Sequence, residues 1–124
     1  MGTRGIIISE LIFLIKKSEL GEGIAKGYSF DQINDQLFLT ITDNQVSVWR
    51  NKCPHNHRPL EYQKDKFLSA DGKHIVCYAH SAHFDKDTGL CFAGPCLGKK
   101  LNKIQHIEIN EKIYISAEDI IEIK

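Results

Sequence analysis

Two pairs of cysteine and histidine residues are the part of the sequence best suited to chemistry. Cys53 and His55 are separated by one residue, and Cys77 and His80 are separated by two. The stretch 56–76 lies between the two pairs. Thiolate and imidazole groups are the usual ligands of zinc and of some iron–sulfur centres. Two loops that face each other would therefore bring two sulfur and two nitrogen ligands to one metal centre.

Three interpretations of these pairs compete. A zinc site takes cysteine and histidine in tetrahedral sets, but zinc fingers usually pair Cys with Cys and His with His, with the histidines on a helix. Here each loop mixes the two types, and neither lies in a helical pattern. A [2Fe–2S] cluster in which one iron takes two Cys and the other two His suits mixed loops, because each loop can reach both irons. The third interpretation is a chance arrangement of polar loops.

The residues around the two pairs favour the iron–sulfur interpretation. The stretches NKCPHNHRPL (51–60) and IVCYAHSAHFD (75–85) resemble the two cluster loops of Rieske ferredoxins. The stretch 87–91 resembles the Thr-Gly turn that follows in that family, and Gly94-Pro95 resembles the start of its third, proline-containing loop. The resemblance extends from about residue 11 to 116 and is closest to small stand-alone ferredoxin-like proteins.

The resemblance implies a ligand set and a fold. It implies that Cys53 and Cys77 hold one iron and that His55 and His80 hold the other, in one [2Fe–2S] cluster per chain. The implied fold is all-β: the Rieske fold, a three-layered antiparallel β sandwich with a small cluster-binding loop subdomain.

The implied domain organisation is simple. We expect residues 1–124 to form a single Rieske domain, with residues 1–10 frayed and the cluster-binding region at about 51–96. A chain of this length has room for one modest core.

Other histidines lie near the expected ligands. His57 could compete with His55, but the resemblance favours His55 and leaves His57 as a surface group beside the cluster. We expect His83 to be exposed at the tip of the second loop, and His74 and His106 to be ordinary surface residues.

Two further cysteines, Cys91 and Cys96, follow the second loop. Rieske proteins of respiratory complexes have an extra disulfide between the cluster loops, at positions that correspond to Arg58 and Ala79 here, so that disulfide is absent. We expect Cys91 and Cys96 to be reduced, partly buried thiols, with a disulfide between them as the alternative.

The resemblance also predicts a low reduction potential. High-potential Rieske proteins have hydroxyl donors at the positions of Ala82 and Phe84, where this chain has none. Hydrogen bonds to the cluster are a main determinant of its potential. Ser81, where Gly is usual, could supply a bond from another direction.

The sequence on either side of the region with the Cys and His pairs predicts short strands. Apolar residues alternate over 37–41 and 46–48 around the turn pair Asp43-Asn44, and again over 107–115 around Asn110-Glu111. Each pattern is typical of a β-hairpin. Weaker strand candidates are Leu11–Lys16 and Gly27–Phe30.

The C-terminal residues allow two interpretations. The stretch 116–119 has the form of a capping box, which predicts a short helical turn, and 120–124 could instead be an edge strand. Trp49, Phe67 and Phe84 are expected in the core.

Composition excludes several classes of function. Sixteen basic and sixteen acidic residues balance to zero net charge, so nothing indicates nucleic acid or an anionic membrane as a partner. No stretch has the pattern of a secretion signal or a membrane span, which predicts a reducing cytoplasm.

The function expected from these observations is that of an electron carrier, with no catalytic residues of its own. The chain lacks a Gly-rich dinucleotide motif after a strand, so protein partners, a reductase and a terminal oxygenase or reductase, would supply and accept the electron. The alternatives are a small subunit or regulatory module of a larger reductase, similar to that of nitrite reductase, and a zinc-binding or sensor module.

Overall fold

The computed structural model describes residues 10–31, 34–54, 57–79 and 81–119. Ten short strands and one 3-10 turn, η2 (Lys17–Glu19), make up most of the regular structure of this part of the chain. The strands are β1 (Leu11–Lys16), β2 (Lys26–Tyr28), β3 (Leu37–Thr42), β4 (Gln45–Arg50), β5 (Ile75–Cys77), β6 (Ala82–Phe84), β7 (Cys91–Ala93), β8 (Lys103–Ile104), β9 (Ile107–Ile109) and β10 (Lys112–Ser116).

The central sheet has the strand order β2-β3-β4-β8, and all of its pairs are antiparallel. β3 and β4 form the first predicted hairpin, with Phe38 opposite Trp49. Asp43 and Asn44 have φ values of 51° and 65°, as a two-residue turn with two left-handed positions requires. The first hairpin prediction is therefore confirmed, including its turn.

A second sheet, with the order β1-β10-β9, contains the other predicted hairpin. Its turn residues Asn110 and Glu111 also have positive φ, at 50° and 64°. β1 pairs with β10 along its length, with an irregularity between Phe13 and Ile15. The candidate strand at 11–16 is confirmed with its predicted bounds, whereas the one at 27–30 is shifted to Lys26–Tyr28.

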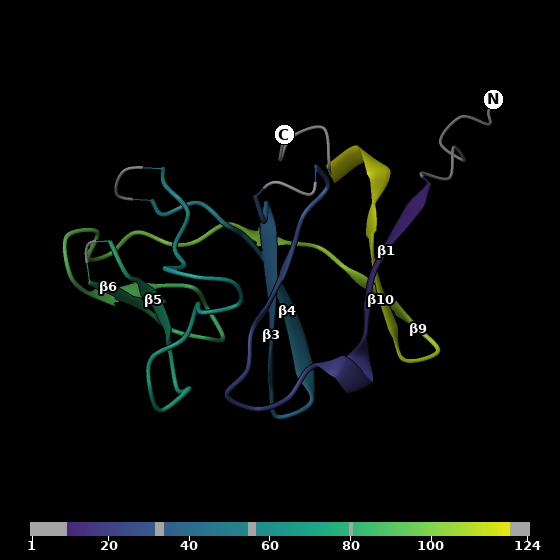
Figure 1. The fold of residues 1–124 in the computed structure, drawn as a ribbon, viewed down its shortest axis with the longest axis horizontal. Helices are drawn as coiled ribbons and strands as arrows, with labels where there is room; N and C mark the ends of the chain where they lie inside the picture. The colour runs from purple at the N-terminus through teal and green to yellow at the C-terminus, as the bar shows by residue number, and fades with distance from the viewer. Residues whose placement is uncertain (1–9, 32–33, 55–56, 80, 120–124) are drawn as a thin grey trace.

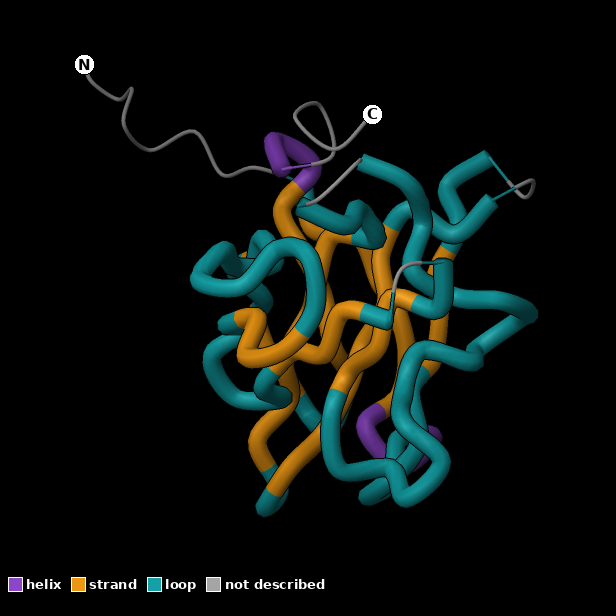
Figure 2. Tube along the Cα trace, turned by 90° about the vertical axis from the view of Figure 1, so that its left-hand side faces the viewer, coloured by secondary structure: helices purple, strands orange, loops and turns teal. Residues whose placement is uncertain are grey.

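The third sheet, β5-β6-β7, is the smallest and belongs to the region of the cysteines. Figure 1 shows the three sheets side by side, with β5 and β6 on the left, β3 and β4 in the middle and β9 and β10 on the right. Figure 2, which looks from the β5 side, shows that loops make up most of this end of the molecule. The three-layered antiparallel arrangement is thus present.

The central sheet separates two hydrophobic cores, since its side chains alternate between the two faces. Leu37, Leu39 and Val48 pack in the core shared with β1 and β10. Phe38 and Trp49 pack in the other core, which contains all four cysteines. Both faces of β3 and β4 are therefore covered, which explains why consecutive residues of these strands are buried.

Aromatic side chains fill the core on the cysteine side, as predicted. Trp49, Phe67 and Phe84 are fully buried, and the rings of Phe38 and Phe67 stack with centroids 4.3 Å apart. The indole nitrogen of Trp49 donates to Oγ1 of Thr40 at 3.0 Å, so this buried polar group is satisfied.

At the C-terminal end, residues 117–119 are helical, and the amide of Glu118 donates to Oγ of Ser116. The predicted helical turn is present, while 120–124 lies outside the described residues. The described residues include no helix with the length and apolar character that crossing a membrane requires.

Candidate metal centre

The first cysteine loop is closed by two backbone hydrogen bonds. The amide of Cys53 donates to the carbonyl of Arg58 at 2.8 Å, and the amide of His57 donates to the carbonyl of Cys53 at 2.7 Å. His57 adopts φ of 63°, a left-handed conformation that tightens the turn. These bonds hold the loop while the Cys53 thiol stays fully buried. His55 lies outside the described residues.

The second cysteine loop is the turn of the β5–β6 hairpin. Cys77 ends β5 and pairs with Ala82 at the start of β6, so residues 78–81 connect the two strands. Ser81 has φ of 56°, which explains why the family prefers glycine there, because the left-handed region is costly for residues with a Cβ atom. Cys77 is fully buried, and His80 lies outside the described residues.

The two loops are tied to each other by the backbone. The amide of Tyr78, which follows Cys77, donates to the carbonyl of Leu60 at 3.0 Å. Leu60 follows the first loop and is itself fully buried. This bond fixes the second loop against the first, and both cysteines belong to the same hydrophobic core.

The side chain of Asn51 anchors the first loop through three hydrogen bonds. Its Oδ1 accepts the amide of Leu60 at 2.8 Å. Its Nδ2 donates to the carbonyl of Asp35 and to the carboxylate of Glu61, each at 2.9 Å. Asn51 therefore connects the β2–β3 segment to both ends of the first cysteine loop. Sequence reasoning missed this role, although a polar residue directly after a buried strand was the available signal.

The proline-containing third loop lies against the second. Gly94 has φ of 101°, and a Cβ atom at this position would lie 2.7 Å from Cα of Ala82 and 2.8 Å from the carbonyl oxygen of Ser81. Only a glycine lets the two backbones approach this closely. The segment that resembles the start of the third loop therefore lies in direct backbone contact with the second loop.

The turn between β6 and β7 is built by Asp85. Its Oδ1 accepts the amides of Asp87 at 2.7 Å and Thr88 at 2.8 Å, and its carbonyl accepts the amide of Gly89. The backbone hydrogen bond from Thr88 lowers the pKa of Asp85, and the bond from Asp87 lowers it further, while burial opposes both. Gly89 itself packs on the ring of Trp49. The predicted Thr-Gly turn thus connects the cysteine region to the central sheet.

His74 and His83 contact each other, and neither is fully exposed. Nε2 of His74 lies 2.8 Å from Nδ1 of His83, and the ring of Phe92 packs against both. Both histidines are partly buried. The expectation that His83 is exposed at a loop tip, and that His74 is an ordinary surface residue, is therefore wrong. His83 lies in β6 and pairs with Val76, so strand alternation turns its ring away from the core.

Of the remaining histidines, His57 is exposed, as predicted. His106 is partly buried, and burial lowers its pKa. Burial also lowers the pKa of His74, and the charge of His83 acts in the same direction.

The spare cysteines are more deeply buried than expected. Cys91 and Cys96 are each 1% exposed, and their sulfur atoms lie 3.2 Å apart. All four cysteines are among the described residues, and none is in a disulfide. Burial, followed by hydrogen bonding to Cys91, raises the pKa of Cys96 to about 12, so this thiol keeps its proton.

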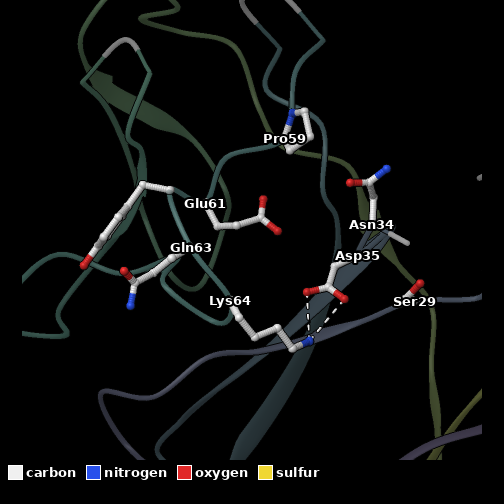
Figure 3. A pocket seen from close by; sticks show the side chains of 8 residues that line it. Ser29, Asn34, Asp35, Pro59, Glu61, Gln63 and Lys64 are labelled. Carbon is white, nitrogen blue, oxygen red and sulfur yellow. Dashed lines mark hydrogen bonds and ion pairs between the residues drawn. The ribbon is translucent and has the colours of Figure 1, made fainter. Parts of the chain in front are cut away.

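A polar groove of about 630 Å³ lies beside the first loop. Figure 3 shows Pro59 and Glu61 on one side of it and Asp35 and Lys64 on another. The ammonium of Lys64 donates to both oxygens of Asp35, at 3.2 and 2.9 Å. Burial opposes ionisation of Lys64, but the hydrogen bond and charge of Asp35 outweigh it and raise the pKa of Lys64. The described residues that line this groove include no thiol or imidazole.

The described part of the site fits an iron–sulfur cluster. Two thiols, on two loops tied to each other, lie buried in one core, where thiolate ligands would be shielded from water. Within the described ranges, no group of three or more Cys, His, Asp or Glu side chains forms a metal site. The two imidazoles that would complete the set, His55 and His80, fall in two of the three gaps between those ranges.

Comparison with known proteins identifies the family. The Rieske [2Fe-2S] domain matches residues 10–110. No curated protein is similar enough to the chain to count as a match.

Solved structures share the fold. The ferredoxin of Sphingomonas yanoikuyae B1 has 21% identity and a TM-score of 0.67, over 86% of this chain and 98% of that one. The ferredoxin of carbazole 1,9a-dioxygenase from Nocardioides aromaticivorans IC177 has 20% identity and a TM-score of 0.66, over 87% and 98%.

A third similar structure is a chain in the complex of reduced oxygenase and oxidized ferredoxin in carbazole 1,9a-dioxygenase. It has 17% identity and a TM-score of 0.65, over 88% of this chain and 94% of that one. These similarities confirm the predicted all-β fold, and the family match decides for the iron–sulfur interpretation over zinc. The chain belongs to the Rieske [2Fe-2S] domain family, and its cofactor is a [2Fe–2S] cluster.

Proposed function

We propose that this protein is a one-electron carrier, a Rieske-type ferredoxin that takes an electron from a reductase and passes it to an acceptor such as a terminal oxygenase. The family match carries the proposal. It is supported by two ferredoxin structures, each of which aligns with this chain over nearly its whole length. When bound, the cluster supplies reversible one-electron chemistry.

The proposed ligands are Cys53 and Cys77 for one iron and His55 and His80 for the other. Burial of both described thiols in one core supports the cysteine half of this set. The histidine half rests on the resemblance of the C-x-H and C-x-x-H spacing. In this arrangement the two buried thiols would hold the sulfur-ligated iron away from solvent.

A terminal oxygenase is the partner that the structural comparisons favour. One similar structure is, by its title, a complex of oxygenase and ferredoxin. The balanced charge of this chain gives no support for nucleic acid or an anionic membrane as a partner. We further propose a cytoplasmic location, which suits four buried cysteines without disulfides.

We also propose a low reduction potential. Ala82 and Phe84 are fully buried and carry no hydroxyl group that could donate to the cluster. Hydroxyl donors stabilise the more negative reduced state, so their absence favours a value toward the lower end of the range of about −150 to +300 mV for Rieske centres.

An anaerobic redox titration of the purified protein, followed by EPR, tests the proposal. We expect one reversible one-electron transition and a reduced signal typical of mixed His/Cys ligation, with a midpoint in the lower part of that range. Reduction and reoxidation should occur without loss of iron. A protein that binds iron but shows no reversible couple would refute the carrier function. Co-purification with a large catalytic subunit would instead favour a role as the small subunit of a reductase.

A further inference from the structure

The charged residues of this chain are unevenly distributed, although they balance overall. Residues 50–103 contain ten Lys and Arg but five Asp and Glu, whereas the rest of the chain contains six Lys and Arg and eleven Asp and Glu. Salt screens charges beyond about 8 Å at physiological ionic strength, so a partner responds to the charges that it meets locally. The net charge of zero therefore combines a basic region with an acidic one.

The basic region includes the loops that carry the cysteines. The first loop (51–60), the second loop (78–81) and the proline-containing loop (94–100) contain no Asp or Glu, and their cationic residues are Lys52, Arg58, Lys99 and Lys100. The last three of these are exposed. The amide of Tyr78 bonds to the carbonyl of Leu60, and Gly94 lies against Ala82, so the three loops contact each other. Cations from separate parts of the sequence thus belong to one end of the molecule.

Carboxylates of the same region gather at the other end of the small sheet. Cys77 and Ala82 are paired at one end of the β5–β6 hairpin, and Ile75 and Phe84 are paired at the other. Beyond the second end lies a cavity of about 410 Å³, whose charged lining residues are Glu22, Asp71, Lys73, Asp85, Lys86 and Asp87. The small sheet is therefore electrically asymmetric along its strands.

The other two carboxylates of the region are hydrogen-bonded or ion-paired. Glu61, which follows the first loop, accepts Nδ2 of Asn51 at 2.9 Å. Asp65 lies 3.4 Å from Nζ of Lys64 and 3.9 Å from Nζ of Lys26, which offset its charge. The charge of the three loops is thus set mainly by their own lysine and arginine residues.

Apolar side chains are exposed among these cations. Leu97, in the proline-containing loop, is 68% exposed, and Tyr78, directly after Cys77, is 37% exposed. Protein interfaces combine apolar and aromatic anchors with charged groups that steer the encounter and fix its orientation. The surface formed by Arg58, Tyr78, Leu97, Lys99 and Lys100, here called the basic face, has this composition.

We propose that the electron-transfer partner docks on the basic face and presents a carboxylate-rich surface around its own redox centre. This inference rests on the proposed function, in which one electron passes from the reduced cluster to the partner, which is thereby reduced. The first and second loops carry the proposed ligands, so docking here places the partner next to the cluster. The acidic remainder of the chain is repelled by such a surface, which orients the two proteins before contact.

Voltammetry of the cluster-loaded protein on two gold electrodes tests the inference. One electrode carries a monolayer that ends in carboxylates and stands in for the partner, and the other carries a monolayer that ends in ammonium groups. Carboxylates should attract the basic face and bring the cluster close, whereas ammonium groups should attract the acidic part of the chain. At low salt we expect electron transfer to be about tenfold faster, or more, on carboxylates. Raising the salt to about 1 M, where the Debye length is about 3 Å, should remove this advantage.

Two double variants with the same change in net charge locate the effect. Lys99→Glu with Lys100→Glu reverses two charges of the basic face and should lose most of the advantage of the carboxylate electrode. Lys16→Glu with Lys112→Glu is the control and should keep it. Both control lysines are exposed and lie opposite each other in β1 and β10, on the other side of the molecule from β5 and β6 (Figure 1). If the first variant fails to take up a cluster, Lys99→Gln with Lys100→Gln should lose a smaller part of the advantage.

Equal rates on the two electrodes, or equal losses in the two double variants, would overturn the inference. Tight binding of a single-stranded DNA oligonucleotide that is abolished by Lys99→Glu with Lys100→Glu and kept by the control would overturn it as well, because the cations would then serve a nucleic acid. A protein without a reversible couple on either electrode or in solution would instead refute the proposed function.

Discussion

The backbone amide of Leu60 donates to Oδ1 of Asn51 at 2.8 Å, across the base of the first cysteine loop. The carbonyl of Leu60 also accepts the amide of Tyr78. Leu60 is therefore hydrogen-bonded both to Asn51 and to the second loop. One buried side-chain amide, at the start of the stretch 51–60, thus helps to position both cysteines.

We expect Asn51→Ala to weaken the site. The change leaves the buried amide of Leu60 without a partner, at a cost of about 1 to 3 kcal/mol in the free energy of unfolding. It should also lower the iron content of the purified protein, since the first loop loses its anchor. Iron analysis and denaturant unfolding measure the two effects. Asn102→Ala, at an exposed position, is the control and should change neither.

The proline-containing loop offers a second matched comparison. Gly94 and Gly98 both have positive φ, at 101° and 88°, but only Gly94 lies against the second cysteine loop. Alanine at either position therefore carries a conformational cost of about 1 kcal/mol or more. Gly94→Ala adds a clash with the backbone of Ala82 and should lose cluster in addition. Equal iron contents in the two variants would show that the contact does not hold the second loop.

Substitution of the ligand candidates decides between neighbouring residues. His57→Ala should leave the visible spectrum nearly intact, because His57 is exposed and its backbone, not its ring, closes the loop. His55→Ala should lose the mixed-ligand EPR signal. The opposite pair of results would move the ligand from His55 to His57. Cys77→Ser should prevent cluster assembly, whereas Cys91→Ser, at an equally buried cysteine, should not.

The partly buried histidines His74 and His106 predict a pH dependence of the free energy of unfolding. Burial lowers the pKa of His74 and of His106 below 6.5, so between the folded and unfolded pKa values the unfolded chain binds more protons. The free energy of unfolding should therefore fall as the pH drops below about 6.5 and level off below the folded pKa values. Denaturant unfolding between pH 8 and 5 measures the slope. The double variant His74→Gln, His106→Gln should flatten it, and an unchanged slope would assign the effect to other groups.

Much of the fold could be predicted from short-range patterns. Turn pairs such as Asp43-Asn44 tolerate positive φ, and alternation on either side of them marks the two strands of a hairpin. Leu11–Lys16 was predicted with its bounds as well, although its apolar residues are consecutive and do not alternate with polar ones. Gly27–Phe30 was displaced because β2 has three residues, too few for a pattern to fix its ends.

The surroundings of the site were less predictable, because they depend on contacts between distant residues. The pairing of His74 with His83 follows from the register of β5 with β6, which the sequence between them does not specify. The hydrogen bond from the amide of Tyr78 to the carbonyl of Leu60 likewise joins two loops that are separate in the sequence. The burial of Cys91 and Cys96 was underestimated for a related reason, since both face a core that several segments build together.

The two-sided burial of the β3–β4 hairpin has a consequence for the biogenesis of the protein. With the proposed ligands, iron would bind only on the side of this hairpin that contains the cysteines. The opposite core, which includes Leu37, Leu39, Ile113 and Ile115, would then form without the metal. We expect newly made chains to fold this core first. The cysteine region should then stay flexible until the cluster is inserted. Amide hydrogen exchange of iron-free protein should then show slow exchange in β3, β4 and β10 and fast exchange in β5–β7; uniform fast exchange would mean that the metal organises the whole chain.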